Sequence, residues 1–337
     1  MLRIRIFNFF AFYSFIAVYA LPVVCMPESS LHILYVALQS RGILTLSFDP
    51  SKSIQTSLEI LDISTDAGFM PGWLKDGGDR IYSISRTHFP TNASASGENG
   101  IIGEASYLFK YNLSHPGPGT NGSQVQSNPH EAIFDPSGQY MFVNDRGADL
   151  IYVYHVEGPY NLTQISTVML PPGTGPRHTT FRVFNSTRTF MYLVSELDNT
   201  VRVFSLDGVS NNLEREPTAH PPSLNIMLRQ TASTLGPGSS RTSPNDTFLA
   251  SEVALSNDGK FAYVSNRATK TLASDTLTIY SVHPNTGNNS AHLVYLGQNN
   301  TFGKIPRHFS LSPDPETRYV AVANETLGPA AVIWDRR

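Results

Sequence analysis

The feature that most constrains the fold is a pattern that the chain repeats, made of a strand, a tight turn, a second strand and a third strand. Copies begin at residues 129, 176, 250 and 306. In the first copy, two short apolar runs flank the turn sequence Asp-Pro-Ser-Gly at 135–138, and the β-branched and aromatic run 150–156 follows. Repeats of about 40 to 50 residues built from short strands are typical of β-propellers, in which each repeat forms one sheet. The sequence therefore predicts an all-β propeller whose longer repeats carry loop insertions.

The N-terminal third carries the same pattern less clearly. A first sheet is expected from strands at 31–37, 43–48 and 58–61, and a second from strands near 70–74 and 80–84. Between 85 and 128 only 107–111 is a convincing strand, and 114–128 is rich in the Gly, Pro and Ser of loops. At least six sheets can be counted. We predict a seven-bladed propeller with one degenerate blade and a truncated C-terminal closure, because the chain stops directly after a third-strand pattern.

The first 25 residues have the composition of a secretory signal peptide. A start with two arginines precedes the apolar segment 6–20, and cleavage is expected after Ala20 or Cys25. A membrane anchor is the alternative, which we disfavour because the apolar run is shorter than the ~20 residues that a spanning helix needs. We therefore expect a leader over 1–25, a single propeller domain over 26–337, and no transmembrane span once the leader is removed.

Potential N-glycosylation sites support the secretory route. Nine Asn-X-Ser/Thr sequences occur, at Asn92, Asn112, Asn121, Asn161, Asn185, Asn245, Asn288, Asn299 and Asn324. Such sequences mark surface loops of secreted proteins when they are used, although some arise by chance in loops rich in Asn and Ser. We expect a secreted glycoprotein, which the cell surface or wall could also retain.

Composition excludes several other classes of protein. Cys25 is the only cysteine, so no intramolecular disulfide can form and stability has to come from sheet packing. A hydrophobic content of 40% is enough for a substantial core. The net charge is −3 and only 15% of residues are charged, which leaves no basic stripe for DNA or RNA.

The few charged residues gather at equivalent positions of the repeats. In a propeller the first strand of each sheet lines the channel and the second runs antiparallel beside it, so the start of one lies next to the end of the other. These positions hold ten ionisable residues: His130, Arg146, Arg177, His178, Glu196, Glu252, Arg267, Arg307, His308 and Glu325. Any one of them alone is more often a solvated loop residue. Together they predict a ligand-binding mouth, because arginines hold anions while histidines and carboxylates exchange protons.

Other chemical signatures are absent from the sequence. His130-Glu131 begins like a zinc-protease motif, but the partner position holds Phe134 and the segment is a predicted strand. No Gly-X-Ser-X-Gly elbow is present. Acid-base or electrostatic chemistry without a metal or an organic cofactor is the mechanism that remains.

Four short motifs, in order, resemble the seven-bladed propeller lactonases. They are Gly-Pro-Arg-His at 175–178, Ser-Glu-Leu at 195–197, Asn-Arg at 266–267 and Pro-Arg at 306–307. The family includes bacterial 6-phosphogluconolactonase and the fungal 3-carboxy-cis,cis-muconate lactonizing enzyme, a cycloisomerase also known as a carboxymuconate cyclase. The resemblance covers roughly 30–335 and is weakest between 85 and 128. The Gly-Pro-Arg-His form is closer to the lactonase branch than to the cycloisomerase branch.

The resemblance implies that the catalytic residues are His130, Arg177, Glu196 and Arg267. The arginines would anchor an anionic substrate and stabilise the oxyanion that develops at the lactone carbonyl, and Glu196 or His130 would move a proton. The other residues of the mouth are expected to bind substrate: His178, Glu252, Arg307, His308 and Arg146.

Two functions therefore stay open at the level of the sequence. One is a secreted lactonase that hydrolyses or forms the lactone ring of a small anionic molecule, binding the lactone or its open acid. The substrate would be extracellular, whereas phosphogluconolactone is a cytosolic metabolite. The other function is that of a non-catalytic secreted or cell-surface glycoprotein that uses the propeller for binding.

Overall fold

A computed structural model describes residues 16–18, 32–38, 42–49, 51–53, 56–65, 71–76, 80–85, 91–96, 102–119, 122–158, 161–208, 224–238, 248–268, 273–284, 291–326, 328 and 331–336. The chain divides into two compact units, 1–110 and 111–337. Every regular element of the described residues is a β-strand, and these strands form six antiparallel sheets. The expected all-β architecture is confirmed.

The first unit contains two four-stranded sheets. In the first sheet the strand order is β1 (Ile16–Val18), β2 (His32–Leu38), β3 (Gly42–Phe48) and β4 (Leu58–Ser64). In the second it is β5 (Pro71–Asp76), β6 (Arg80–Ser85), β7 (Thr91–Ser96) and β8 (Ile102–Phe109). Each sheet is a simple meander in which sequence neighbours pair.

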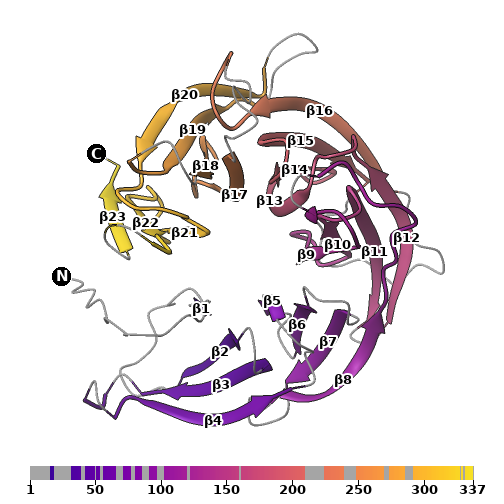
Figure 1. The fold of residues 1–337 in the computed structure, drawn as a ribbon, viewed down its shortest axis with the longest axis vertical. Helices are drawn as coiled ribbons and strands as arrows, with labels where there is room; N and C mark the ends of the chain where they lie inside the picture. Colours follow the sequence, from indigo (N-terminus) through magenta and orange to yellow (C-terminus); the bar gives the residue numbers. More distant parts are fainter. Residues whose placement is uncertain are drawn as a thin grey trace. The chain divides into compact units, whose positions relative to one another are not determined.

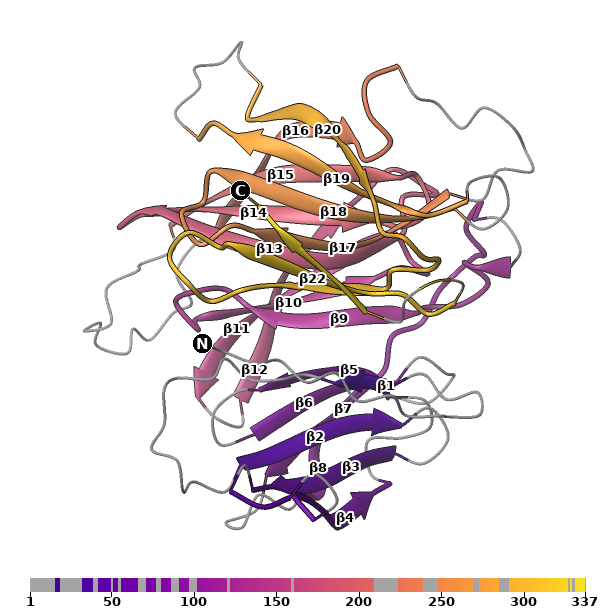
Figure 2. The ribbon, with the colours of Figure 1, turned by 90° about the vertical axis from the view of Figure 1, so that its left-hand side faces the viewer.

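The second unit contains four sheets (Figure 1; seen from the side in Figure 2). The first has β9 (Pro129–Phe134), β10 (Tyr140–Asp145), β11 (Leu150–Gly158) and β12 (Asn161–Met169), and the second has β13 (Pro176–Asn185), β14 (Arg188–Ser195), β15 (Thr200–Asp207) and β16 (Asn225–Ser233). The third has β17 (Phe248–Leu255), β18 (Phe261–Ala268), β19 (Thr276–Val282) and β20 (Leu293–Asn300). The last has three strands, β21 (His308–Leu311), β22 (Tyr319–Ala323) and β23 (Ala331–Asp335). The first strands β9, β13, β17 and β21 lie innermost, and neighbouring first strands contact one another.

The core of this unit lies between the sheets. One apolar cluster packs β10 and β11 against β14 and β15, and a second packs β14 and β15 against β17, β18 and β19. Alternate residues of β14 belong to different clusters: Met191 and Leu193 face the preceding sheet, while Tyr192 and Val194 face the following one. Successive side chains of a strand point to opposite faces. A strand covered on both faces therefore has a continuous apolar run, which is why 190–194 shows no alternation.

Turn residues fix the register of the strand pairs. The carboxylate of Asp135 accepts hydrogen bonds from the backbone N–H groups of Ser137 and Tyr140, at 3.0 and 2.8 Å. Gly138 follows with φ of 69°, a conformation in which a side chain would be strained. The predicted Asp-Pro-Ser-Gly turn is therefore confirmed, and it sets the pairing of Phe134 with Met141.

One expectation needs correction in the N-terminal third. The described residues of 85–128 supply β7 and β8, which complete the second sheet, so the strand prediction at 107–111 found only part of β8. Within the expected leader, Ile16–Val18 pairs with β2 as β1, and the other residues of 1–25 lie outside the described part of the chain. Among the described residues no helix is long and apolar enough to cross a bilayer.

Candidate functional site

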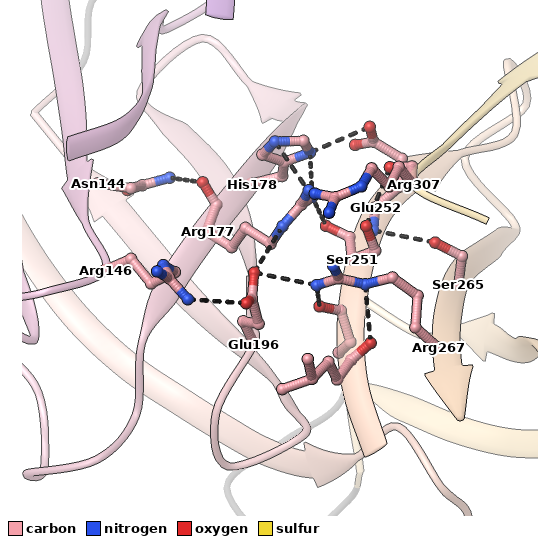
Figure 3. A network of polar contacts seen from close by, with 12 residues as sticks. Asn144, Arg146, Arg177, His178, Glu196, Ser251, Glu252, Ser265, Arg267 and Arg307 are labelled. Atoms are coloured by element: carbon pink, nitrogen blue, oxygen red, sulfur yellow. Dashed lines mark hydrogen bonds and ion pairs between the residues drawn. The ribbon is translucent and has the colours of Figure 1, made fainter. Parts of the chain in front are cut away.

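The charged residues expected at the mouth come together in the second unit, at the inner ends of its four sheets (Figure 3). Arg146 and Glu196 directly follow β10 and β14, whereas Arg177 and His308 stand at the starts of β13 and β21. Glu252 lies within β17, because this strand begins at Phe248, earlier than expected. The adjacency of strand starts and strand ends that the repeat predicts is therefore confirmed.

Glu196 is the centre of the network. Its Oε1 accepts a hydrogen bond from Arg146 Nη1 at 2.8 Å, and its Oε2 accepts one from Arg177 Nε at 2.9 Å. Nη2 of Arg267 lies 3.0 Å from the same Oε2. The side chains of Glu196, Arg177 and Arg267 are 7, 3 and 5% exposed. Three guanidinium groups around one carboxylate leave an excess of positive charge in a nearly dry environment.

Arg177 joins this network to a second one. Its Nη1 donates a hydrogen bond to the backbone oxygen of Ser251 on β17 and lies 3.2 Å from Nε2 of His178. Burial and the neighbouring guanidinium of Arg267 lower the pKa of Arg177 to about 9. Arg177 is therefore charged at neutral pH, although its burial makes this charge unfavourable. An anion bound beside Arg177 would offset the free energy cost of burying the charge.

The second network consists of one carboxylate and two histidines. Oε2 of Glu252 lies 3.0 Å from His178 Nδ1 and 2.7 Å from His308 Nδ1. Burial and the positive charge of Arg177 lower the pKa of His178 to about 4, so this ring is neutral. Burial opposes the ionisation of Glu252, but the hydrogen bonds from the two rings outweigh it and hold the pKa of Glu252 far below its usual range. The hydrogen bond to Glu252 likewise outweighs desolvation at His308 and raises its pKa.

The other expected site residues lie beside these networks. His130 is 3% exposed, and its ring packs edge-on against His178 with 4.9 Å between ring centroids. Arg307 donates through Nε to Glu325 at 2.8 Å in a more exposed pair, whose side chains are 36 and 23% exposed. All ten residues of the mouth thus gather within one unit, but only seven belong to the two networks.

Two residues that the sequence analysis missed position Arg177. The amide of Asn144 on β10 donates to the backbone oxygen of Arg177 at 3.2 Å, to Thr179 Oγ1 at 2.8 Å and to Glu131 Oε2 at 2.9 Å. The carboxylate of Asp149 accepts hydrogen bonds from the backbone N–H groups of Gly173 and Gly175, at 2.7 and 2.6 Å. These contacts fix the loop and the backbone from which Arg177 projects.

The contacts of Asp149 have counterparts in the following sheets. Asn199, before β15, accepts from Ala250 N and donates to Phe248 O, both at 2.9 Å, and Asp275, before β19, accepts from Ile305 N at 2.6 Å. We call Asp149, Asn199 and Asp275 the inter-sheet latches, since each binds the backbone that enters the next sheet. The recurrence of Asp or Asn just before the third strand in the three repeats that begin at 129, 176 and 250 was the available signal.

The geometry suits anion binding next to proton transfer. Preorganised arginines stabilise a negative charge that develops at a carbonyl oxygen, and a carboxylate-bound histidine can exchange a proton with water. Over the part of the chain that the structure describes, no group of three or more His, Cys, Asp or Glu side chains has an arrangement that could hold a metal ion. Metal-free chemistry stays a prediction from the sequence.

Comparison with known proteins decides the family. The model of the family described as "Lactonase, 7-bladed beta-propeller" matches residues 92–333. The chain belongs to this lactonase family. Its β-propeller fold is thereby established, with six sheets among the described residues, whereas the family description gives seven blades.

Individual relatives of this lactonase-family chain carry related names. A probable 6-phosphogluconolactonase of Arthroderma benhamiae is 29% identical over 63% of this chain and 48% of its own length. A 6-phosphogluconolactonase of Formosa agariphila is 26% identical over 60% of this chain and 50% of its own length. The chain therefore spans about half the length of these curated relatives. The solved structure of a periplasmic gluconolactonase of Pseudomonas aeruginosa shares the fold, with a TM-score of 0.68 and 23% identity over 92% of this chain and 81% of that one.

Acid is expected to destabilise the protein through two buried histidines. The pKa of His178 is lowered to about 4, as is that of His292, which burial desolvates and whose Nε2 lies 2.7 Å from the hydroxyl of Tyr192. Between the folded value near 4 and the unfolded value near 6.5, only the unfolded chain binds these protons. The free energy of unfolding should therefore fall as pH is lowered through this window, by about 1.4 kcal/mol per pH unit for each histidine. Urea denaturation at several pH values measures the slope, and a flat profile from pH ~6.5 to pH ~4 would contradict the expectation.

Proposed function

We propose that this protein hydrolyses the lactone of a small anionic molecule, such as a sugar acid that carries an additional phosphate or carboxylate. The observation that carries the proposal is the single carboxylate of Glu196 surrounded by the guanidinium groups of Arg146, Arg177 and Arg267. Membership in the lactonase family and the names of the relatives support the reaction class. The excess of positive charge supports an anionic substrate and a developing oxyanion.

The contacts of the arginines and of Glu196 indicate the role of each residue in the proposed hydrolysis. Arg177 and Arg267 would bind the anionic group or the carbonyl oxygen, since arginine presents several N–H donors in a rigid plane. Both oxygens of Glu196 already accept guanidinium N–H groups, so Glu196 would orient the arginines rather than take a proton from water. This differs from the role that the resemblance implied for Glu196 and leaves proton transfer to a histidine.

Hydrolysis of a matched pair of lactones tests the proposal. We expect the wild-type protein to hydrolyse a phosphorylated or carboxylated sugar lactone with a larger kcat/KM than its uncharged counterpart. Arg177→Ala should lower kcat/KM on the anionic lactone by roughly 10²–10³-fold. Arg318→Ala is the control, because this arginine pairs with Asp335 at the surface, outside both networks. Absence of turnover from a folded wild-type protein on every lactone tried would favour a binding protein without catalysis.

We also propose that the protein enters the secretory pathway and carries N-glycans. Four of the expected acceptor residues, Asn112, Asn161, Asn185 and Asn299, have exposed side chains. Asn324 is only 8% exposed, and its Nδ2 donates to Thr301 O at 2.8 Å, so it is a poor acceptor. The side chains of Asn92, Asn121, Asn245 and Asn288 lie outside the described part of the structure.

Replacing two of these asparagines separates the exposed from the buried sites. Asn112→Gln should remove the mass of one glycan from the secreted protein and leave thermal stability unchanged, because Asn112 is exposed. Asn324→Gln should leave the glycan mass unchanged and lower the free energy of unfolding by about 1–2 kcal/mol, because a buried hydrogen bond is lost. Intact-mass measurement before and after enzymatic removal of N-glycans checks both results. A glycan on Asn324 would contradict the buried position of its amide.

A further inference from the structure

Two histidines share the Glu252 carboxylate, and only one of them is open to solvent. The side chain of His308 is 45% exposed, whereas those of His178 and Glu252 are 5 and 8% exposed. We infer that His308 is the general acid-base of the proposed hydrolysis, that Glu252 orients it, and that His178 holds Glu252 in place. The inference rests on the proposed function and assigns its proton-transfer group.

The hydrogen bonds define which nitrogen of His308 faces the reaction. Nδ1 lies 2.7 Å from Glu252 Oε2, so the proton on Nδ1 is donated to the carboxylate and Nε2 is the basic nitrogen. Nε2 lies 3.2 Å from the hydroxyl of Ser310, an exposed residue two positions further along β21. Water that reaches this exposed hydroxyl is within one hydrogen bond of the base.

Glu252 is itself held rigidly. Its backbone N–H donates to Ser265 Oγ at 3.1 Å, and its Oε1 accepts from Val253 N at 3.1 Å. His178 donates to the same Oε2 as His308 and stays neutral, since burial and the adjacent charge of Arg177 lower its pKa. A carboxylate fixed in this way imposes one tautomer and one ring orientation on His308.

The other titratable residues of the site fit the role of general acid-base less well than His308 does. Glu196 accepts guanidinium N–H groups on both oxygens, and His178 is buried with both ring nitrogens beside partners. His130 is 3% exposed, which separates it from bulk water. Arg177 contacts both Glu196 and the ring of His178, so it links the arginine network to the Glu252 pair.

The chemical steps balance without any further reactant. Neutral His308 takes a proton from water through Nε2 while the water oxygen bonds to the lactone carbonyl carbon. The tetrahedral oxyanion then re-forms the carbonyl, the ring C–O bond breaks, and the departing ring oxygen takes the proton from His308. The product is the open hydroxy acid, and His308 is neutral again.

The dependence on pH gives a readout that a purely structural role would not move. Groups that face His308 are Glu252 on β17, Arg177 and His178 on β13, and Ser310 on its own strand. Because Glu252 raises the pKa of His308, the neutral base should form only above the ordinary value for histidine, and kcat/KM should rise with pH through this titration. Removing the Glu252 charge should move the rising limb to lower pH while the maximal rate falls.

The experiment measures kcat and KM against pH for the wild type, His308→Asn, Glu252→Gln and a control, His115→Asn. His308→Asn should lower kcat by roughly 10²–10⁴-fold, lose the rising limb and regain part of its rate with added imidazole. Glu252→Gln should shift the limb to lower pH. His115 is an exposed histidine whose ring contacts Ser114, so its replacement should change neither rate nor pH profile.

The outcomes distinguish this inference from the proposed function. If His308→Asn keeps the turnover of the wild type and the same rise of kcat/KM with pH, the assignment of His308 is overturned. The proposed function is not affected by that result. A wild-type protein without turnover on any anionic lactone overturns the proposed function and the inference together. NMR titration of the His308 ring is an independent check: a pKa that Glu252→Gln leaves unchanged overturns the role of Glu252, whatever the activity.

Discussion

Replacing Glu196 with glutamine is expected to lower the free energy of unfolding by about 3–5 kcal/mol. The change keeps the size of the side chain but removes the carboxylate charge that contacts Arg146, Arg177 and Arg267. Breaking a buried ion network in this way leaves uncompensated charge, and one of the guanidinium groups would face an amide N–H₂ instead of an oxygen. Urea denaturation of Glu196→Gln beside the wild type measures the loss.

A matched control is available at the edge of the same mouth. Glu325 pairs with Arg307, but its side chain is 23% exposed, so Glu325→Gln should cost less than about 1 kcal/mol. Inorganic phosphate should raise the melting temperature of Glu196→Gln more than that of the wild type, since the variant carries more unpaired positive charge. Equal costs for the two glutamate replacements would show that burial does not decide the stability of these pairs.

Replacing Asp149 with alanine is expected to lower the free energy of unfolding by about 2–4 kcal/mol and to reduce the proposed lactone hydrolysis as well. The N–H groups of Gly173 and Gly175 would lose their acceptor, and the loop that precedes Arg177 would lose its anchor to the preceding sheet. A displacement of Arg177 by about 1 Å can lower kcat/KM by up to about 100-fold. Denaturation and steady-state kinetics on the same preparation measure the two effects.

Exchanging Asp and Asn at two of the inter-sheet latches tests whether these contacts depend on the match of hydrogen-bond donors to acceptors. Both partners of Asp149 are N–H donors, whereas Asn199 faces one donor, Ala250 N, and one acceptor, Phe248 O. Asp149→Asn and Asn199→Asp should therefore each destabilise by about 1–3 kcal/mol, although the shapes barely change. A loss below about 0.5 kcal/mol in both variants would mean that the latches do not depend on the match of donor to acceptor.

Much of the fold could be predicted from local sequence signals. The turn at 135–138 and the apolar runs beside it specify the β9–β10 hairpin because a strand alternates with period two and Gly138 permits the positive φ. The strands at 91–96 and 102–109 were largely missed, since β7 contains no large apolar residue and its sequence resembles that of a loop. Pairing with neighbouring strands, rather than local preference, makes this segment a strand.

The sequence could predict which residues form the site, but not what each of these residues does. The repeat brings Arg177, Glu196 and Arg267 to one mouth, because strand starts and ends of each sheet are adjacent. Which carboxylate meets which cation depends on side chains from different sheets, and no spacing along the chain encodes it. The resemblance to the lactonase family implied proton transfer by Glu196 or His130, whereas the contacts favour His308 with Glu252.

The sequence by itself determined an all-β chain of repeated sheets and the ten ionisable residues at their inner ends, because periodicity and turn chemistry act between near neighbours. Only the tertiary structure decided that Glu196 is enclosed by three arginines and that Glu252 is shared by two histidines. Burial and distances between sheets set these pairings. Burial and the charge of Arg177 keep His178 neutral, whereas the hydrogen bond to Glu252 raises the pKa of the more exposed His308.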